Sequence, residues 1–259
     1  MSRFAWPAPA GVGILAAGIL AATVPVLAQR APSAAPTGLP TDILALACAP
    51  LSTTSVPSTA LHLTGGQDVV TRQIYGSGDL VTLNAGSMNG IRVGQEFYVR
   101  RLQVPMGHKA DGSEPIIVRT AGWIKVWAVD DAMSLATVTH TCDSMEVGDY
   151  LEPFKLPESV VPNPNKPKAE RDHYARVMKG DDLKTIFGKG EFFTINRGTQ
   201  DGVKPGAQFV VYRDKHEKEN FLFELGEAVA VNVGDQMSTL RVTLSRDAFI
   251  EGDYVAERK

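Results

Sequence analysis

The two cysteines are the residues whose type and number point most directly to a defined chemistry. The chain has 259 residues and its only cysteines are Cys48 and Cys142. An even pair of cysteines predicts a disulfide if the chain is exported, which the N-terminus described below indicates. This bridge would close a loop of roughly a hundred residues, which stabilises a fold by on the order of 4 kcal/mol. A rival interpretation stays open, because Leu46-Ala47-Cys48 loosely resembles a lipobox, in which Cys48 would carry a lipid.

The other residue types that serve catalysis or metal binding are not grouped in a recognised pattern. None of the five histidines stands at the spacing of a known metal motif. His140 lies two residues before Cys142, at the end of an expected strand, and is interpreted as a packed or surface histidine. The adjacent carboxylates Asp130-Asp131 and Asp181-Asp182 are expected to be solvated on turns, since paired catalytic acids lie apart across a cleft. We therefore expect no catalytic residue, no metal and no cofactor, and predict that the chain is not an enzyme.

The elements that would position these residues come in two copies. The segment 74–79, Ile-Tyr-Gly-Ser-Gly-Asp, matches the segment 186–191, Ile-Phe-Gly-Lys-Gly-Glu, at an offset of 112 residues. A second block, which ends in Gly-Asp-Tyr at 148–150 and again at 252–254, matches at an offset of 104. Two long collinear blocks in the same order indicate an internal duplication. The repeated turn motif comprises Asn84, Gly86, Gly90 and Gly94 in the first copy and Asn196, Gly198, Gly202 and Gly206 in the second.

Each copy has the pattern of short strands joined by turns. Runs such as 80–83 and 192–195 favour strands, and Asn89-Gly90 and Asp201-Gly202 supply the positive φ angles that tight hairpin turns need. About five or six short strands in about ninety residues predict a small barrel or sandwich. The predicted fold class is therefore all-β, with tandem duplicated small β-barrel or sandwich modules. Residues 168–178 are the only stretch in which one or two helical turns are expected.

The repeated string, Asn-x-Gly-[Ser/Thr]-x-[Asn/Asp]-Gly-[Ile/Val]-[Arg/Lys]-x-Gly-x-x-Phe, occupies residues 84–97 and 196–209. It resembles a motif in the C-terminal domain of the flagellar T-ring assembly protein. More distantly, it is similar to the β-domains of the periplasmic rod-shape-determining protein. The resemblance covers one strand–turn–strand unit in each copy and implies a structural or scaffolding role, without catalytic residues.

The N-terminus has the composition of an export signal. Arg3 precedes an almost wholly apolar run over residues 10–27, and Val26-Leu27-Ala28 fits the small-residue rule for cleavage after Ala28. An uncleaved membrane anchor is the alternative. The chain is thus expected in the periplasm or outer envelope, with membrane contact only through this segment. The expected order is a signal peptide at 1–28, a flexible leader at 29–47, a first β-module with an N-terminal arm at 48–154, a Pro-rich linker at 155–173 and a second β-module at 174–259.

The charge balance argues against nucleic acid as a partner. Charged residues make up 21% of the chain and the net charge is -3, an ordinary soluble composition. We predict a non-catalytic exported scaffold or protein-interaction module of the bacterial cell envelope, whose partners are other envelope proteins. The alternative is a module that binds cell-wall glycan (peptidoglycan), with Tyr98, Trp123 and Trp127 as a candidate recognition surface. The apolar hairpin at 102–121 is expected to pack over the first module or between the modules, or else to dock a partner.

Overall fold

The computed structural model describes residues 39–68, 70, 72–103, 116–158, 165, 167–170, 173–215 and 221–259. All of them belong to one compact unit, Ala31–Lys259. The predicted signal peptide, most of the predicted leader and the tip of the hairpin at 102–121 lie outside the described residues. Within the described part of the chain, no helix is both long and apolar enough to cross a membrane.

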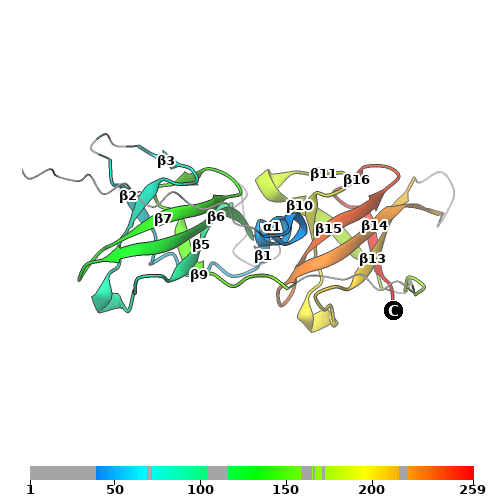
Figure 1. Ribbon diagram of the computed structural model, residues 1–259. Coiled ribbons are helices and arrows are strands. Elements are labelled where there is room, and N and C mark those ends of the chain that lie inside the picture. Colours follow the sequence, from blue (N-terminus) through cyan, green and yellow to red (C-terminus); the bar gives the residue numbers. More distant parts are fainter. Residues whose placement is uncertain are drawn as a thin grey trace, which may run out of the picture. The chain divides into compact units, whose positions relative to one another are not determined.

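The second copy is a closed barrel with the strand order β10-β12-β15-β14-β13-β17 (Figure 1). The strands are β10 (Ala175–Gly180), β12 (Phe192–Ile195), β13 (Gln208–Asp214), β14 (Leu222–Val233), β15 (Ser238–Ser245) and β17 (Tyr254–Glu257), and a small pair, β11 (Ile186–Phe187) with β16 (Phe249–Ile250), lies off the barrel path. On β13 the buried Phe209 and Val211 belong to the barrel core, whereas Val210 and Tyr212 belong to a second buried cluster. Because side chains alternate along a strand, β13 therefore buries both of its faces.

The first copy repeats this strand order as β2-β4-β7-β6-β5-β9. Its strands are β2 (Leu63–Gly66), β4 (Leu80–Leu83), β5 (Glu96–Gln103), β6 (Ile116–Val129), β7 (Ser134–Thr141) and β9 (Tyr150–Pro153), with the pair β3 (Ile74–Tyr75) and β8 (Met145–Glu146) beside them. His62, the residue before β2, forms an isolated bridge with Tyr150 of β9, the strand at the other end of this sheet, and for this reason we call the first copy the first barrel. The Leu63 N–H also donates to the Asp149 carbonyl at 2.9 Å. The prediction of an all-β chain with tandem duplicated modules is confirmed.

The glycines show how closely the two copies correspond. Every glycine with a positive φ angle among the described residues has its counterpart in the other copy, at an offset of 112 or 104 residues. The five pairs are Gly78 and Gly190, Gly90 and Gly202, Gly94 and Gly206, Gly122 and Gly226, and Gly148 and Gly252. The duplication thus extends from the sequence to the backbone conformation of each turn and bulge.

The repeated turn motif holds each barrel together at one point. The Asn84 side chain accepts a hydrogen bond from the His62 N–H at 2.9 Å and donates to the Ala60 carbonyl at 2.7 Å. A Cβ at Gly86 would lie 2.2 Å from the Asp130 carbonyl oxygen, so only glycine fits there. In the second copy Asn196 accepts from the Arg176 N–H at 2.7 Å. The described contacts of the motif are therefore structural in both copies.

One expectation about this motif was wrong. The Asn-Gly and Asp-Gly steps do not form two-residue hairpin turns but end the 3₁₀ turns η1 (Ser87–Asn89) and η3 (Thr199–Asp201). The reason is topological, since the strands joined by these turns, β4 with β5 and β12 with β13, are not neighbours in their sheets. The left-handed glycines that were expected, Gly90 and Gly202, are present with φ of 81° and 83°.

A charged pair is also repeated in the two copies. The guanidinium of Arg101 binds both carboxylate oxygens of Asp149 at 2.7 and 2.8 Å, and Arg213 binds Asp253 in the same way at 2.9 and 2.7 Å. Both aspartates are buried, and each also accepts a backbone N–H. Asp149 thereby ties the start of β9 to β5, and Asp253 ties the start of β17 to β13.

Two further expectations differ from the structure. The prediction of helical turns at residues 168–178 was wrong, because Ala175–Gly180 is strand β10. In this strand the buried Ala175 and Val177 alternate with less buried residues. Instead, α1 (Thr41–Ala47) lies in the segment that was predicted as a flexible leader. So short a helix is stabilised mainly by tertiary packing, here by the contacts of Leu44 and Ala47 with an aromatic cluster.

The apolar base of the hairpin at 102–121 packs as expected. Ile116, Ile117 and Val118 are each 1% exposed and form the first residues of β6. They pair with strand β1 (Leu51–Thr53), which follows α1 and adds to the outer edge of β6. We call residues 39–53, which contain α1 and β1, the N-terminal arm.

Candidate functional site

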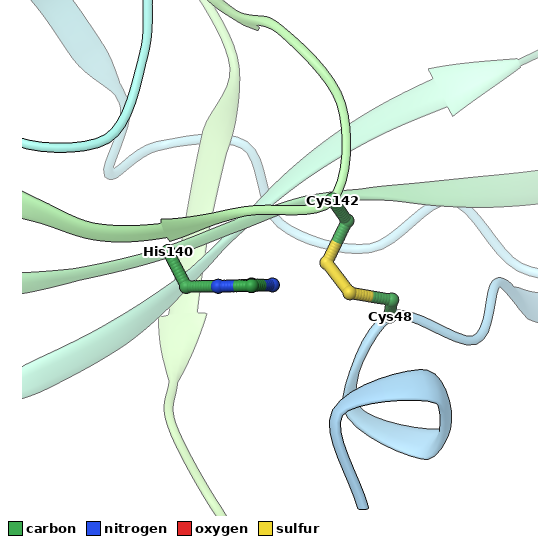
Figure 2. A group of neighbouring side chains, drawn as sticks. All are labelled: Cys48, His140 and Cys142. Atoms are coloured by element: carbon green, nitrogen blue, oxygen red, sulfur yellow. A yellow bond between two sulfur atoms is a disulfide. The ribbon is translucent and has the colours of Figure 1, made fainter. Parts of the chain in front are cut away.

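The N-terminal arm is fixed to the first barrel by a disulfide between Cys48 and Cys142. The two Cα atoms are 5.5 Å apart and 94 residues separate them in sequence. Cys48 follows the last residue of α1, and Cys142 follows the last residue of β7 (Figure 2). The predicted bridge is therefore present, and it joins the arm to a strand of the barrel.

His140 lies beside this bridge. Residues two apart on a strand share a face, so His140 and Cys142 project from the same side of β7. One ring nitrogen of His140 and the two sulfurs lie within 4.8 Å of one another, and Figure 2 shows the ring on the side of β7 where the disulfide lies. Burial lowers the pKa of the His140 imidazole, because desolvation disfavours its charged form. Burial therefore favours the neutral imidazole, whose unprotonated nitrogen can accept a hydrogen bond or bind a metal ion.

An aromatic cluster packs beside the disulfide. The Trp123 ring stacks on His140 with a centroid distance of 4.5 Å and contacts Phe154 at 5.2 Å. Tyr98 contacts Phe154 at 4.7 Å, and its hydroxyl donates to the Lys155 carbonyl at 3.0 Å. The arm covers this cluster through Leu44 and Ala47.

This burial corrects the expectation that Tyr98, Trp123 and Trp127 form one recognition surface. Tyr98 is 7% exposed and Trp123 is 2% exposed, so neither ring offers a face to a ligand. Both lie on the outside of the barrel core, in the cluster covered by the arm. Trp127 is 38% exposed and is the only one of the three that reaches the surface.

Arg100 carries a buried positive charge next to this cluster. Its guanidinium lies 4.2 Å from the centroid of the Tyr98 ring and 3.5 Å from a Glu152 carboxylate oxygen, and it donates to the Thr120 hydroxyl. Burial lowers the pKa of Arg100, and the Glu152 charge partly opposes that shift. Because Glu152 balances the charge, the arrangement fits a residue that holds Tyr98 in place rather than one that binds an anion.

The second copy has none of these groups at the corresponding positions. His140, Cys142 and Trp123 correspond to Leu244, Arg246 and Glu227 at the offset of 104 residues. The bridge and its histidine are therefore a specialisation of the first copy on a framework that both copies share.

The second copy also differs from the first at one strand edge, the edge of β14 that corresponds to the edge of β6 paired with the arm. In the first copy β1 pairs with Ile116, Ile117 and Val118 of β6. The offset of 104 residues places Leu222 of β14 where Val118 stands, and Leu222–Glu224 pairs with β13 on one side. Among the described residues, no strand pairs with the other side of Leu222–Glu224. Two aromatic side chains stand at this edge, Phe221 at 56% and Phe223 at 39% exposure.

Comparison with known proteins found no family model and no curated protein that matches this chain. The resemblance to the flagellar and rod-shape β-domains therefore stays a prediction. The position of His140 beside the disulfide was not predicted from the sequence. The one sequence feature that could have indicated it is the His-x-Cys spacing at 140–142. This spacing places the two side chains on one face only if the residues are known to be in a strand.

Proposed function

We propose that this chain is a non-catalytic protein-interaction module of the cell envelope, and that it binds an extended segment of a partner protein as an added strand along β14. The observation that carries the proposal is the contrast between the two copies. The edge of the first copy is occupied by the chain's own strand β1, whereas the corresponding edge of the second copy carries exposed aromatic side chains.

The physics of strand addition supports this kind of partner. The open side of a strand presents N–H and C=O groups that another extended chain can pair with, and the main-chain hydrogen bonds supply affinity. Phe221 and Phe223 contact each other at 4.8 Å between ring centroids, and the Lys215 ammonium lies 5.0 Å from the Phe223 centroid, so the two rings offer an apolar surface with a positive charge beside it. The occupant that fits is an extended segment with an apolar residue facing the two rings.

The proposed compartment is consistent with the covalent chemistry of the chain. A disulfide is compatible with an oxidising, exported environment. The proposal that the chain acts in the periplasm or outer envelope rests on this bridge together with the predicted export signal.

Site-specific photo-crosslinking tests the proposal. A photoreactive phenylalanine analogue is placed at Phe221 and, as the matched control, at Met88, which is 78% exposed on the first copy. In the cells that produce the chain, we expect one defined partner to be captured from position 221 and not from position 88. Adding Phe223→Glu should abolish the capture, because it puts a charge in the apolar surface. Equal capture from both positions, or capture that survives Phe223→Glu, would refute the proposal.

A pelleting assay with isolated peptidoglycan separates this proposal from glycan binding. We expect the chain to stay in solution. Pelleting that is lost in Trp127→Ala would contradict a protein partner and favour the glycan alternative, since Trp127 is the exposed ring of the three aromatic residues considered for stacking.

A further inference from the structure

We propose that the reduced form of this chain binds one Zn²⁺ ion through Cys48, His140 and Cys142, so that the disulfide controls a metal site. This inference is independent of the proposed partner, because it concerns the first copy and the partner edge lies on the second. Among the described residues, these three form the one group of histidine, cysteine and acidic side chains whose ligand atoms converge closely enough for a metal ion.

The geometry requires only small movements. Tetrahedral Zn²⁺ with Zn–S distances of about 2.3 Å and Zn–N of about 2.1 Å needs sulfurs about 3.8 Å apart and the nitrogen about 3.6 Å from each sulfur. Breaking the S–S bond frees the two sulfurs to separate to that distance. The His140 nitrogen lies within 4.8 Å of the sulfurs, so it must approach by at most about 1.2 Å.

The framework holds the ligands in place from two sides. His140 and Cys142 come from one face at the end of β7, where His140 stacks on the buried Trp123. Cys48 comes from the arm, which pairs with β6 through β1 and so stays attached to the barrel when the S–S bond is broken. All three ligands are partly exposed, which gives an ion a path from solvent.

The charges also suit the surroundings. Two thiolates and a neutral imidazole around Zn²⁺ sum to zero, and a neutral centre suits the apolar neighbours Leu44, Trp123 and Phe154. Two cysteines and one histidine with an open fourth position form a known zinc ligand set, in which water completes the tetrahedron.

The redox step balances with a dithiol as the reductant. A reduced dithiol, of the kind that thiol–disulfide oxidoreductases carry, gives two electrons and two protons to the Cys48–Cys142 bond and becomes a disulfide itself. The S–S bond breaks and two thiols form. When Zn²⁺ binds, the thiols lose those two protons to solvent and two Zn–S bonds form. In the reverse direction, a protein disulfide of the same class takes up two electrons from the two thiolates and two protons from solvent and becomes a dithiol, while the Cys48–Cys142 bond re-forms and the ion is released.

The test is a zinc titration of the full chain against a chromophoric chelator, in the oxidised form and after reduction with a phosphine. We expect one equivalent of tightly bound Zn²⁺ in the reduced chain and none in the oxidised chain. With Co²⁺ as a spectroscopic probe, the reduced chain should show thiolate-to-metal charge transfer and the visible bands of tetrahedral cobalt.

The decisive variant is His140→Gln, because it leaves the disulfide intact and its oxidised fold can be checked first. It should weaken Zn²⁺ binding by at least about 100-fold, since losing only a partner of a ligand costs 10–100-fold. His62→Gln is the matched control, because His62 lies elsewhere in the first copy, and its affinity should be unchanged. Wild-type affinity in His140→Gln, zinc binding by the oxidised chain, or a reduced chain that neither binds zinc nor recovers its near-UV circular dichroism with zinc, would each overturn the proposal.

Discussion

Removing the disulfide should destabilise the first barrel and leave the second unchanged. The perturbation is the double replacement Cys48→Ala with Cys142→Ala, which avoids free thiols. In the chain-entropy model a cross-link across a loop of about 100 residues stabilises the fold by about 4.7 kcal/mol. The bridge here spans 94 residues, which is close to that loop length. The double replacement should therefore lower the free energy of unfolding by nearly the same amount.

The effect is large enough to measure without ambiguity. With a urea dependence of about 2 kcal/mol per M, a loss of about 4.7 kcal/mol lowers the unfolding midpoint by about 2 M. Apart from Trp6 in the predicted signal peptide, the tryptophans are Trp123 and Trp127, and both lie on β6 of the first barrel. Tryptophan fluorescence of a shortened chain that begins at Gln29, and so lacks Trp6, therefore reports the first barrel alone.

Two controls make the result interpretable. Reducing the wild-type chain with a phosphine, with a chelator present, should reproduce the shift of the variant. Amide hydrogen exchange of Leu240 and Val242, in the core of the second barrel, should not change. A fluorescence midpoint that moves by less than about 0.3 M would refute the view that the bridge stabilises the first barrel by constraining the unfolded chain.

The remaining predictions concern the framework that the copies share. Gly122→Ala should destabilise the first barrel by at least about 3 kcal/mol by urea unfolding, since its Cβ would lie 2.1 Å from the His140 carbonyl oxygen, whereas Gly90→Ala, which meets open space, should cost only about 1 kcal/mol. A cost for Gly122→Ala no greater than that for Gly90→Ala would show that the close approach is absent. Arg213→Met should cost the second barrel roughly 3 kcal/mol, because it leaves the buried Asp253 carboxylate without its partner. A loss below about 1 kcal/mol would mean that the pair is dispensable. Burial raises the pKa of the Glu257 carboxyl in the folded chain above its ordinary value. The protonated carboxyl therefore stabilises the folded state at a pH below the pKa of the unfolded chain. This stabilisation is lost as the pH rises through the pKa of the folded chain. Glu257→Gln should therefore be more stable than wild type at pH 7 and equally stable near pH 4, as thermal unfolding at the two pH values would measure, and an equal difference at both would contradict the assignment.

The sequence was sufficient for the features that depend on backbone conformation. Glycines that recur at fixed offsets, such as Gly148 and Gly252, require the same turn in both copies, so the duplication and its strands could be predicted. The alternation along β13 was less clear because Val210 and Tyr212 are apolar on the outer face as well, where they lie in a second buried cluster. Only the folded chain reveals what covers that face.

The candidate site was harder to predict because it depends on a contact between distant segments. The disulfide could be inferred from the cysteine count, since two cysteines allow only one intramolecular pair. The helix α1 could not, because its stability comes from packing against Trp123 rather than from its own sequence. The burial of Tyr98 and Trp123 follows from the same packing. The aromatic spacing that predicted a shared outer face for Trp123 and Trp127 could not predict that the arm covers one of them.

If the edge of β14 receives a strand from a partner protein, as we propose, the outward amides of that edge become hydrogen-bonded. The most direct test is amide hydrogen exchange of β14, measured on the free chain and on its complex with the partner captured at position 221. We predict that exchange slows by at least about tenfold at the amides within Leu222–Glu224 that do not donate to β13, the factor expected for one net hydrogen bond of about 1.4 kcal/mol. The amides of β1, already paired with β6, should be unchanged. Unchanged exchange at Leu222–Glu224 in a saturated complex would contradict strand addition.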